Sequence, residues 1–290
     1  MMGYVFGDAR FARVRPDSID ISVPGGKQAS VAARILGSGT VSVSLGKRSS
    51  LSFSVIGDSC ERAHMVRINF ALGEGSRCAQ TLNFRGRAKK SEVSVNGLCG
   101  NGSVVALNTI LQGLHTKACI GLKCARNCTS HVNILSLPAK ARHSVSAGVL
   151  HNGSNSVNSV LCSGIAKPAC SVEFNGSLTV PESIRDIESS LHGKFIAYPG
   201  SAVSALPVLN VHSRDVRTSH GVSVTNISPE TVYYMASRCI AEKEACSLIE
   251  RGGVEFMINR MSNAISSVLP GHKVKVDWDG GGTRACKGGA

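Results

Sequence analysis

Apolar and polar residues alternate over most of residues 41–225. The alternating segments are separated by Gly, Ser, Asn or Asp, and they include VSVSLG, LSFSVIGD, VRINFALGEG, HVNILSL and CSVEFNGSLTV. Alternation of this kind is typical of strands with one buried face, and turns about every ten residues favour a sandwich, a barrel or a β-solenoid. No fixed-length repeat is visible, which argues against a strict hexapeptide or nonapeptide solenoid and leaves an irregular β-helix open.

The pattern changes after the last alternating segment, where apolar spacings of three and four residues predict helices. Ser228, followed by Pro and Glu, suits the N-cap of a first helix. A second helix is expected over AEKEACSLIERGG and should end at Gly252. A third should follow at once over residues 254–268, with an apolar stripe that packs on the strands or on a partner.

These patterns predict four regions. Residues 1–40 are expected to form a short or partly ordered N-terminal segment. The β core should cover residues 41–227, and the helical region residues 228–270. Residues 271–290 are rich in glycine and are expected to be disordered.

The composition favours thin, stacked layers over a bulky core. Aromatic residues make up 4% of the chain and there are 31 glycines, so the core must consist mostly of Val, Ile, Leu and Ala. The formal net charge of +13 attracts phosphate backbones, anionic lipid or acidic proteins without specifying which. Because RGRAKK is the only dense basic cluster and aromatic residues are not interleaved with it, nucleic acid is not the expected partner.

Membrane insertion and export are not expected. No segment contains 18 consecutive apolar residues, and the first residues lack the apolar core of a secretory signal. The chain therefore reads as soluble and intracellular. Its 11 cysteines are expected to be mostly reduced thiols.

One group of cysteines has spacings that suit a metal site. Cys119, Cys124 and Cys128 follow one another at intervals of five and four residues, close enough to share a soft metal or an iron-sulfur cluster if the segment is a loop. A fourth ligand is not evident, since His115 and His131 are the only neighbours of a suitable type. Buried thiols that pack as small apolar groups are the alternative.

The second half of the chain resembles the SufB/SufD family of iron-sulfur cluster assembly proteins. Three segments carry the resemblance: GIAKPACSVEFNGSLTVPE, SHGVSV and YYMASRCIAEKEACSLIERGG. The resemblance implies a right-handed parallel β-helix with a short C-terminal helical region. Two positions depart from the family pattern: Thr218 stands where SufD-type chains often have Cys, and Cys239 replaces a turn glycine. The thiol of Cys239 is expected to be buried.

The resemblance also implies a function. The triplet Ser219, His220 and Gly221 favours a SufD-like chain, a non-catalytic scaffold subunit that pairs with a SufB-like chain and a SufC-like ABC-type ATPase. The complex would build a transient iron-sulfur cluster and transfer it to recipient apoproteins, in the cytoplasm or in an organelle matrix or stroma of bacterial origin. The involvement of a flavin stays open. ATP hydrolysis should lie on a partner, because this chain has no G-x-x-x-x-G-K-[ST] motif.

The resemblance assigns roles to particular residues. His220 would lie at the interface with the second β-helical chain, as a residue for cluster assembly and an iron ligand. The helical region would dock the ATPase through the family-matching residues Tyr233, Arg238, Glu242, Glu244, Leu248 and Ile249.

Two other functions stay open. One is a basic, β-rich protein that binds nucleic acid or another anionic polymer and shares only the fold with the family. The other is a SufB-like or self-pairing scaffold, which differs from the SufD-like interpretation mainly in stoichiometry.

Overall fold

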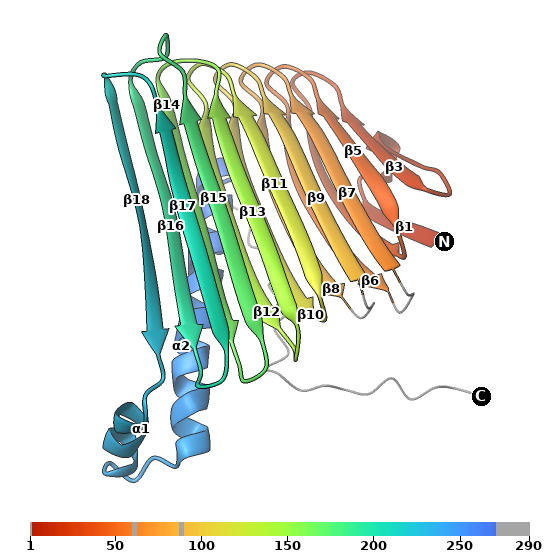
Figure 1. Ribbon diagram of the computed structural model, residues 1–290. Helices are drawn as coiled ribbons and strands as arrows, with labels where there is room; N and C mark the ends of the chain where they lie inside the picture. The colour runs from red at the N-terminus through yellow and green to blue at the C-terminus, as the bar shows by residue number, and fades with distance from the viewer. Residues whose placement is uncertain (1, 60–62, 87–89, 271–290) are drawn as a thin grey trace, which may run out of the picture.

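The computed structural model describes residues 2–59, 63–86 and 90–270, and Figure 1 shows them as a stack of parallel strands flanked by helices. Strands alternate between two nine-stranded sheets, so that each sheet pairs every second strand along the chain. This topology is a β-solenoid. It confirms the mainly β class and selects the solenoid among the three architectures that alternation leaves open.

The two sheets, called sheet A and sheet B below, contain nine strands each. Sheet A contains β1 (Met2–Gly7), β4 (Gln28–Leu36), β6 (Ser50–Ser59), β8 (Arg77–Gly86), β10 (Val104–Gly113), β12 (Thr129–Pro138), β14 (Ser156–Ala166), β16 (Ile187–Ala197) and β18 (Val216–Asn226). Sheet B contains β2 (Ala12–Val14), β3 (Ser18–Val23), β5 (Gly39–Leu45), β7 (Ala63–Leu72), β9 (Lys90–Cys99), β11 (Thr116–Cys124), β13 (Arg142–His151), β15 (Ser171–Val180) and β17 (Ala202–Val211).

Parallel pairing runs through the solenoid, and it starts with β3 and β4, before residue 41. Only the first strands differ: β1 pairs with β4 and β2 with β3 in antiparallel fashion, on either side of a short 3-10 helix, Ala9–Phe11. Val5, Phe11 and Ala12 pack against the core at this end. The expected glycine-rich tail, residues 271–290, lies outside the described residues.

The core lies between the two sheets, because every second side chain of a strand points inward. In β13, for example, buried side chains alternate with more exposed ones along the whole strand. Stacked strands keep the same register, so that each inward residue lies on an inward residue of the preceding coil. Small and β-branched residues fill most of these positions, as the composition predicts, and four fully buried rings add bulk: Phe53, Phe84, Phe174 and Phe195.

Two helices follow the last strand. The first, α1 (Pro229–Ala236), begins at Ser228, whose side chain accepts a hydrogen bond from the Thr231 amide at 3.3 Å, which confirms the expected cap. The second, α2 (Glu242–Val268), packs lengthwise on the outer face of sheet A. No helix within the described residues has the length and apolarity needed to cross a membrane.

The expected helix end at Gly252 is wrong, because α2 continues without a break through Gly252 and Gly253. Neither glycine has a positive φ, and Gly252 has open space where a Cβ would lie. A Cβ on Gly253 would lie 2.8 Å from Cδ1 of Ile196 in β16. Gly253 therefore marks a close approach of the helix to the sheet, and neither glycine marks a helix terminus.

Candidate functional site

His220 lies at the C-terminal end of the solenoid. It occupies β18 opposite Leu191 of β16, at an inward position of the last coil. Its Nδ1 lies 3.2 Å from the carbonyl oxygen of Pro207 in β17. A carbonyl oxygen only accepts, so Nδ1 carries the proton and Nε2 is the nitrogen with a free lone pair. The neutral imidazole can therefore act as a metal ligand through Nε2.

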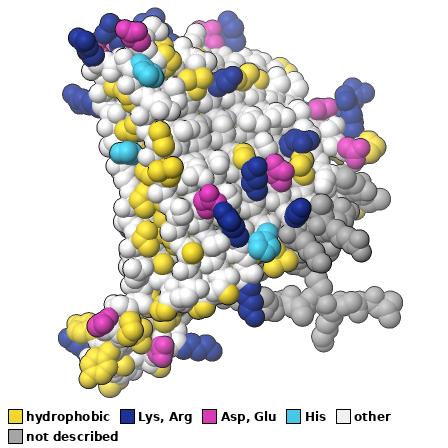
Figure 2. All heavy atoms as spheres, in the orientation of Figure 1, with side chains coloured by type: hydrophobic (Ala, Val, Ile, Leu, Met, Phe, Trp, Pro, Cys, Tyr) yellow, Lys and Arg dark blue, Asp and Glu magenta, His cyan; other side chains and the backbone are white. Residues whose placement is uncertain are grey.

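The coil around His220 has no further coil stacked on it among the described residues. Its inward positions continue the buried columns of β15 and β16, yet they are only partly buried or exposed. These positions form a surface called the end ring below: Val203, Ala205, Pro207, Leu209, Val211, Val216, Thr218, His220, Val222 and Val224. Hydrophobic side chains run along this edge of the molecule in Figure 2. His220 is the only ionisable member, and Thr218 supplies a hydroxyl in place of a thiol.

His192 belongs to a different face from His220. It pairs in register with Gly221, and its Nε2 lies 3.5 Å from the hydroxyl of Ser219. Because its neighbour Leu191 points inward, His192 points outward from β16. The two imidazoles therefore do not form a pair.

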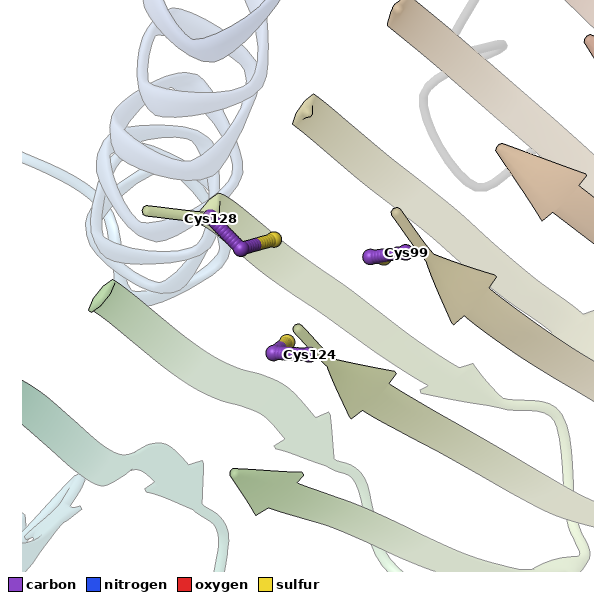
Figure 3. Close-up of side chains that lie close together, drawn as sticks. All are labelled: Cys99, Cys124 and Cys128. Atoms are coloured by element: carbon purple, nitrogen blue, oxygen red, sulfur yellow. The ribbon is translucent and has the colours of Figure 1, made fainter. Parts of the chain in front are cut away.

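A second group of potential ligands lies inside the solenoid. The sulfur atoms of Cys99, Cys124 and Cys128 all lie within 4.8 Å of one another, and all three residues are buried (Figure 3). Cys99 and Cys124 are register partners on β9 and β11, and Cys128 follows the next turn. Two of the three cysteines expected to form a metal site are brought together.

The expected participation of Cys119 is wrong. Cys119 lies five positions before Cys124 on the same strand, β11, and an odd separation puts two strand residues on opposite faces. Cys124 points into the core, and Cys119 points outward. The spacing suits a shared site only if the segment is a loop, and residues Thr116–Cys124 form a strand instead.

The two histidines considered as a fourth ligand also lie elsewhere. His115 is exposed, and its Nδ1 accepts a hydrogen bond from the Arg142 amide at 3.1 Å. His131 is adjacent to the inward-facing Ser130 and lies on the outer face of sheet A, where burial and the nearby Arg260 lower its pKa. Neither side chain belongs to the cluster of Cys99, Cys124 and Cys128.

The pKa values of the three thiols depend on one another. Hydrogen bonds from the thiols of Cys124 and Cys99 lower the pKa of Cys128 to about 4. The same contacts, together with burial, raise the pKa of Cys99 well above its usual range. The contact with Cys128 raises the pKa of Cys124 to about 12. The three sulfurs form a soft donor set that suits a thiophilic metal.

The residues expected to dock a partner lie on α1, in the turn after it and on the first turns of α2. Tyr233 is 78% exposed and Leu248 40% exposed. Glu242 and Glu244 are exposed and Ile249 is half-buried, while Arg238 lies over the Tyr234 ring. This region, called the helical lobe below, extends beyond the sheets, and its apolar side chains are visible at the lower left of Figure 2.

The turn between the helices departs from the expectation for Cys239. Its side chain is exposed and not buried, and its φ of 62° lies in the left-handed region that glycine favours. The backbone of the turn thus adopts a conformation that glycine favours, although a cysteine occupies the position.

A family model described as SUF system FeS cluster assembly, SufBD core domain, matches residues 123–253. The chain therefore carries a SufBD core domain. This segment runs from the end of β11 to the middle of α2 and includes His220, Cys124 and Cys128. The resemblance to the SufB/SufD family is confirmed there, and Cys99 lies outside the match.

Curated proteins that are similar to this chain carry names of the same family. The chain is 26% identical over 110 residues to an iron-sulfur cluster assembly SufBD family protein of Mycobacterium leprae. The aligned segment covers 38% of this chain and 13% of the relative. It is 26% identical over 114 residues to the iron-sulfur cluster assembly protein SufD of Bacillus subtilis, which covers 39% of this chain and 26% of the relative. A SufBD family protein of Staphylococcus saprophyticus is 23% identical over 110 residues, or 24% of its length. The chain thus matches about a quarter or less of each relative.

Proposed function

We propose that this chain is a SufD-like scaffold subunit of an iron-sulfur cluster assembly complex. It pairs with a SufB-like chain and a SufC-like ABC-type ATPase, and the nascent cluster is its cargo, passed on to recipient apoproteins. The SufBD core domain, the SufD relative and the triplet around His220 support this proposal. The chain itself does no chemistry on ATP, since its sequence lacks a phosphate-binding loop motif.

The observation that carries the proposal is the uncovered end ring with one histidine in it. In every preceding coil the inward residues are covered by the next coil, whereas those of β17 and β18 are open. Contiguous exposed apolar surface on a soluble protein marks an interaction site. A second solenoid end would cover this ring and enclose the Nε2 atom of His220, where iron can bind between the two chains.

The helical lobe is proposed as the ATPase contact. It exposes Tyr233, Tyr234 and Leu248, and large aromatic side chains are typical anchors of protein interfaces. The helical lobe extends beyond the sheets, so a bound ATPase and a second solenoid can be accommodated at separate surfaces.

The test is co-expression with the SufB-like and SufC-like chains of the same source, followed by size exclusion and by iron and sulfide analysis. His220→Ala should leave the complex folded and strongly reduce its cluster content. His212→Ala is the matched control, because His212 is an exposed histidine of the same coil outside the end ring, and it should retain the wild-type content. Equal cluster content in the two variants would contradict the role of His220.

The alternatives give different results in the same experiment. Binding to an anionic polymer predicts no stable partner chains, and an affinity that falls steeply with added salt and ignores His220→Ala. A self-pairing scaffold predicts a homodimer that forms without a SufB-like chain and that a charge in the end ring, such as Val222→Lys, disrupts.

A further inference from the structure

The internal cysteines interrupt a column of stacked, inward-pointing side chains that is apolar in the coils before them. Leu45 and Leu72 are stacked at the inward ends of β5 and β7, and Cys99 follows in register on β9. The same column continues through Cys124 on β11 and His151 on β13. Leucine gives way to three potential metal ligands in three consecutive coils.

Cys128 interrupts a second column. In other coils a serine lies four residues after the leucine of the first column, and its hydroxyl donates a hydrogen bond to a turn carbonyl. Ser49 donates to Gly46 and Ser76 to Gly73, both at 2.7 Å. Cys128 stands at the corresponding place after Cys124, and its sulfur lies 3.6 Å from the hydroxyl of Ser103 in the preceding coil. The cysteines that replace leucine in the first column and serine in the second therefore lie close together inside the solenoid.

His151 supplies a fourth donor in register with Cys124. Its side chain is fully buried, and its Nε2 lies 2.9 Å from the hydroxyl of Ser189, which fixes the ring. Its Nδ1 is buried and has no hydrogen-bond partner within the described part of the chain. A buried polar atom without a partner costs free energy, and metal-binding histidines typically have the second nitrogen held as Ser189 holds this one. His151 and Cys128 also interact electrostatically.

We propose that Cys99, Cys124, Cys128 and His151 bind one divalent ion of the zinc class inside the solenoid. Three sulfurs and one imidazole form a tetrahedral donor set that suits zinc and excludes magnesium or calcium, which require oxygen ligands. With Zn–S bonds of about 2.3 Å, tetrahedral sulfurs lie about 3.8 Å apart. The three sulfurs lie within 4.8 Å of one another, so they would close on the ion by about 1 Å or less. His151 would complete the set from the register position beside Cys124 by turning its unpartnered Nδ1 towards the ion.

The position of the site allows an ion to enter and gives it a structural effect. The turn between Cys124 and Cys128 exposes Arg126 and Asn127, so the site lies directly beneath the surface. The four ligands come from three consecutive coils, and the ion links these coils in the middle of the stack. This inference does not depend on the proposed function, since none of its ligands belongs to the end ring.

The experiment uses the full chain, purified and stripped of metal under reducing, anaerobic conditions. Cobalt(II) is the probe, because its absorption reports tetrahedral geometry and thiolate ligation, and zinc is then added to displace it. We expect one cobalt per chain with a tetrahedral, sulfur-ligated spectrum. Cys124→Ser and His151→Ala should lose or alter this spectrum, whereas Cys119→Ser, on the same strand but facing outward, should retain it.

Further variants separate ligation from folding. Ser189→Ala should leave the spectrum tetrahedral and weaken binding by about 10- to 100-fold, as loss of a ligand-orienting hydrogen bond does. Zinc should raise the melting temperature of wild type but not of Cys124→Ser, with circular dichroism showing that both fold without metal. His220→Ala should bind cobalt as wild type does, so that failure of the proposed function is distinguishable. An octahedral spectrum, or equal binding by Cys124→Ser and wild type, would overturn the proposal.

Discussion

Substitution of the two adjacent glycines in α2 tests the path of the helix. In a helix interior, Gly→Ala stabilises by about 1 kcal/mol because alanine loses less backbone entropy. Gly252 has open space around its missing Cβ, so Gly252→Ala should gain this full amount. On Gly253 the new Cβ would lie 2.8 Å from Cδ1 of Ile196. Displacing that flexible side chain costs about 1 kcal/mol, so Gly253→Ala should be close to neutral.

Urea unfolding and hydrogen exchange of the α2 amides measure both variants. The expected result is a difference of about 1 kcal/mol in favour of Gly252→Ala, with slower exchange along α2. If the helix ended at Gly252 in a left-handed terminal conformation, alanine there would instead cost about 1–2 kcal/mol. Destabilisation by Gly252→Ala would therefore refute the continuous helix, and equal effects at both positions would refute the close approach to β16.

Three further predictions concern the core, pH and the helical turn. Gly97→Ala should destabilise by about 1–3 kcal/mol in urea unfolding, because its Cβ would lie 2.0 Å from Cζ of Phe70; Gly121→Ala, with its nearest contact at 3.4 Å, should be nearly neutral. Burial lowers the pKa of His143 to about 4, so stability should fall as the pH drops from 6.5 towards 4, by up to about 3 kcal/mol, and His143→Gln should flatten this dependence. Cys239→Gly should stabilise by about 1 kcal/mol in thermal unfolding, because it relieves a φ of 62°; an unchanged midpoint would refute this.

Much of the fold follows from local patterns. Alternation identifies the strands because each has one face inside, and the cap at Ser228 and the stripe of Val254, Met257 and Met261 identify the helices. The choice of a solenoid over a sandwich does not follow, because it depends on which strands pair, and alternation carries no pairing information. The expected helix end at Gly252 is wrong because the sequence does not distinguish a glycine within a helix from a glycine that ends one.

The cluster of buried cysteines shows that spacing in the sequence does not by itself decide which side chains meet. The strand register and the face on which each side chain lies also decide it. Cys124 and Cys128 were found because they are close in sequence, while Cys99 and His151 lie 25 and 27 residues from Cys124 and meet it only through the register. A signal was present: CGNGS, CARNC and HNGSN each combine a ligand with a following turn at nearly equal intervals. It is readable once the length of a coil is known.

Three histidines show how the solenoid separates structural from functional imidazoles. His143 has both nitrogens engaged: Nδ1 lies 2.9 Å from the Ser136 hydroxyl, and Nε2 lies 3.0 Å from the Leu114 carbonyl oxygen. His151 has one nitrogen engaged and one buried without a partner, next to three thiols. His220 has Nδ1 engaged at the open end of the stack. Because a neutral imidazole binds a metal through the nitrogen that its neighbours leave unprotonated and open, His143 is confined to stability. For His151 and His220 we propose an internal ion and cargo at an interface, respectively, at sites that can be disrupted independently.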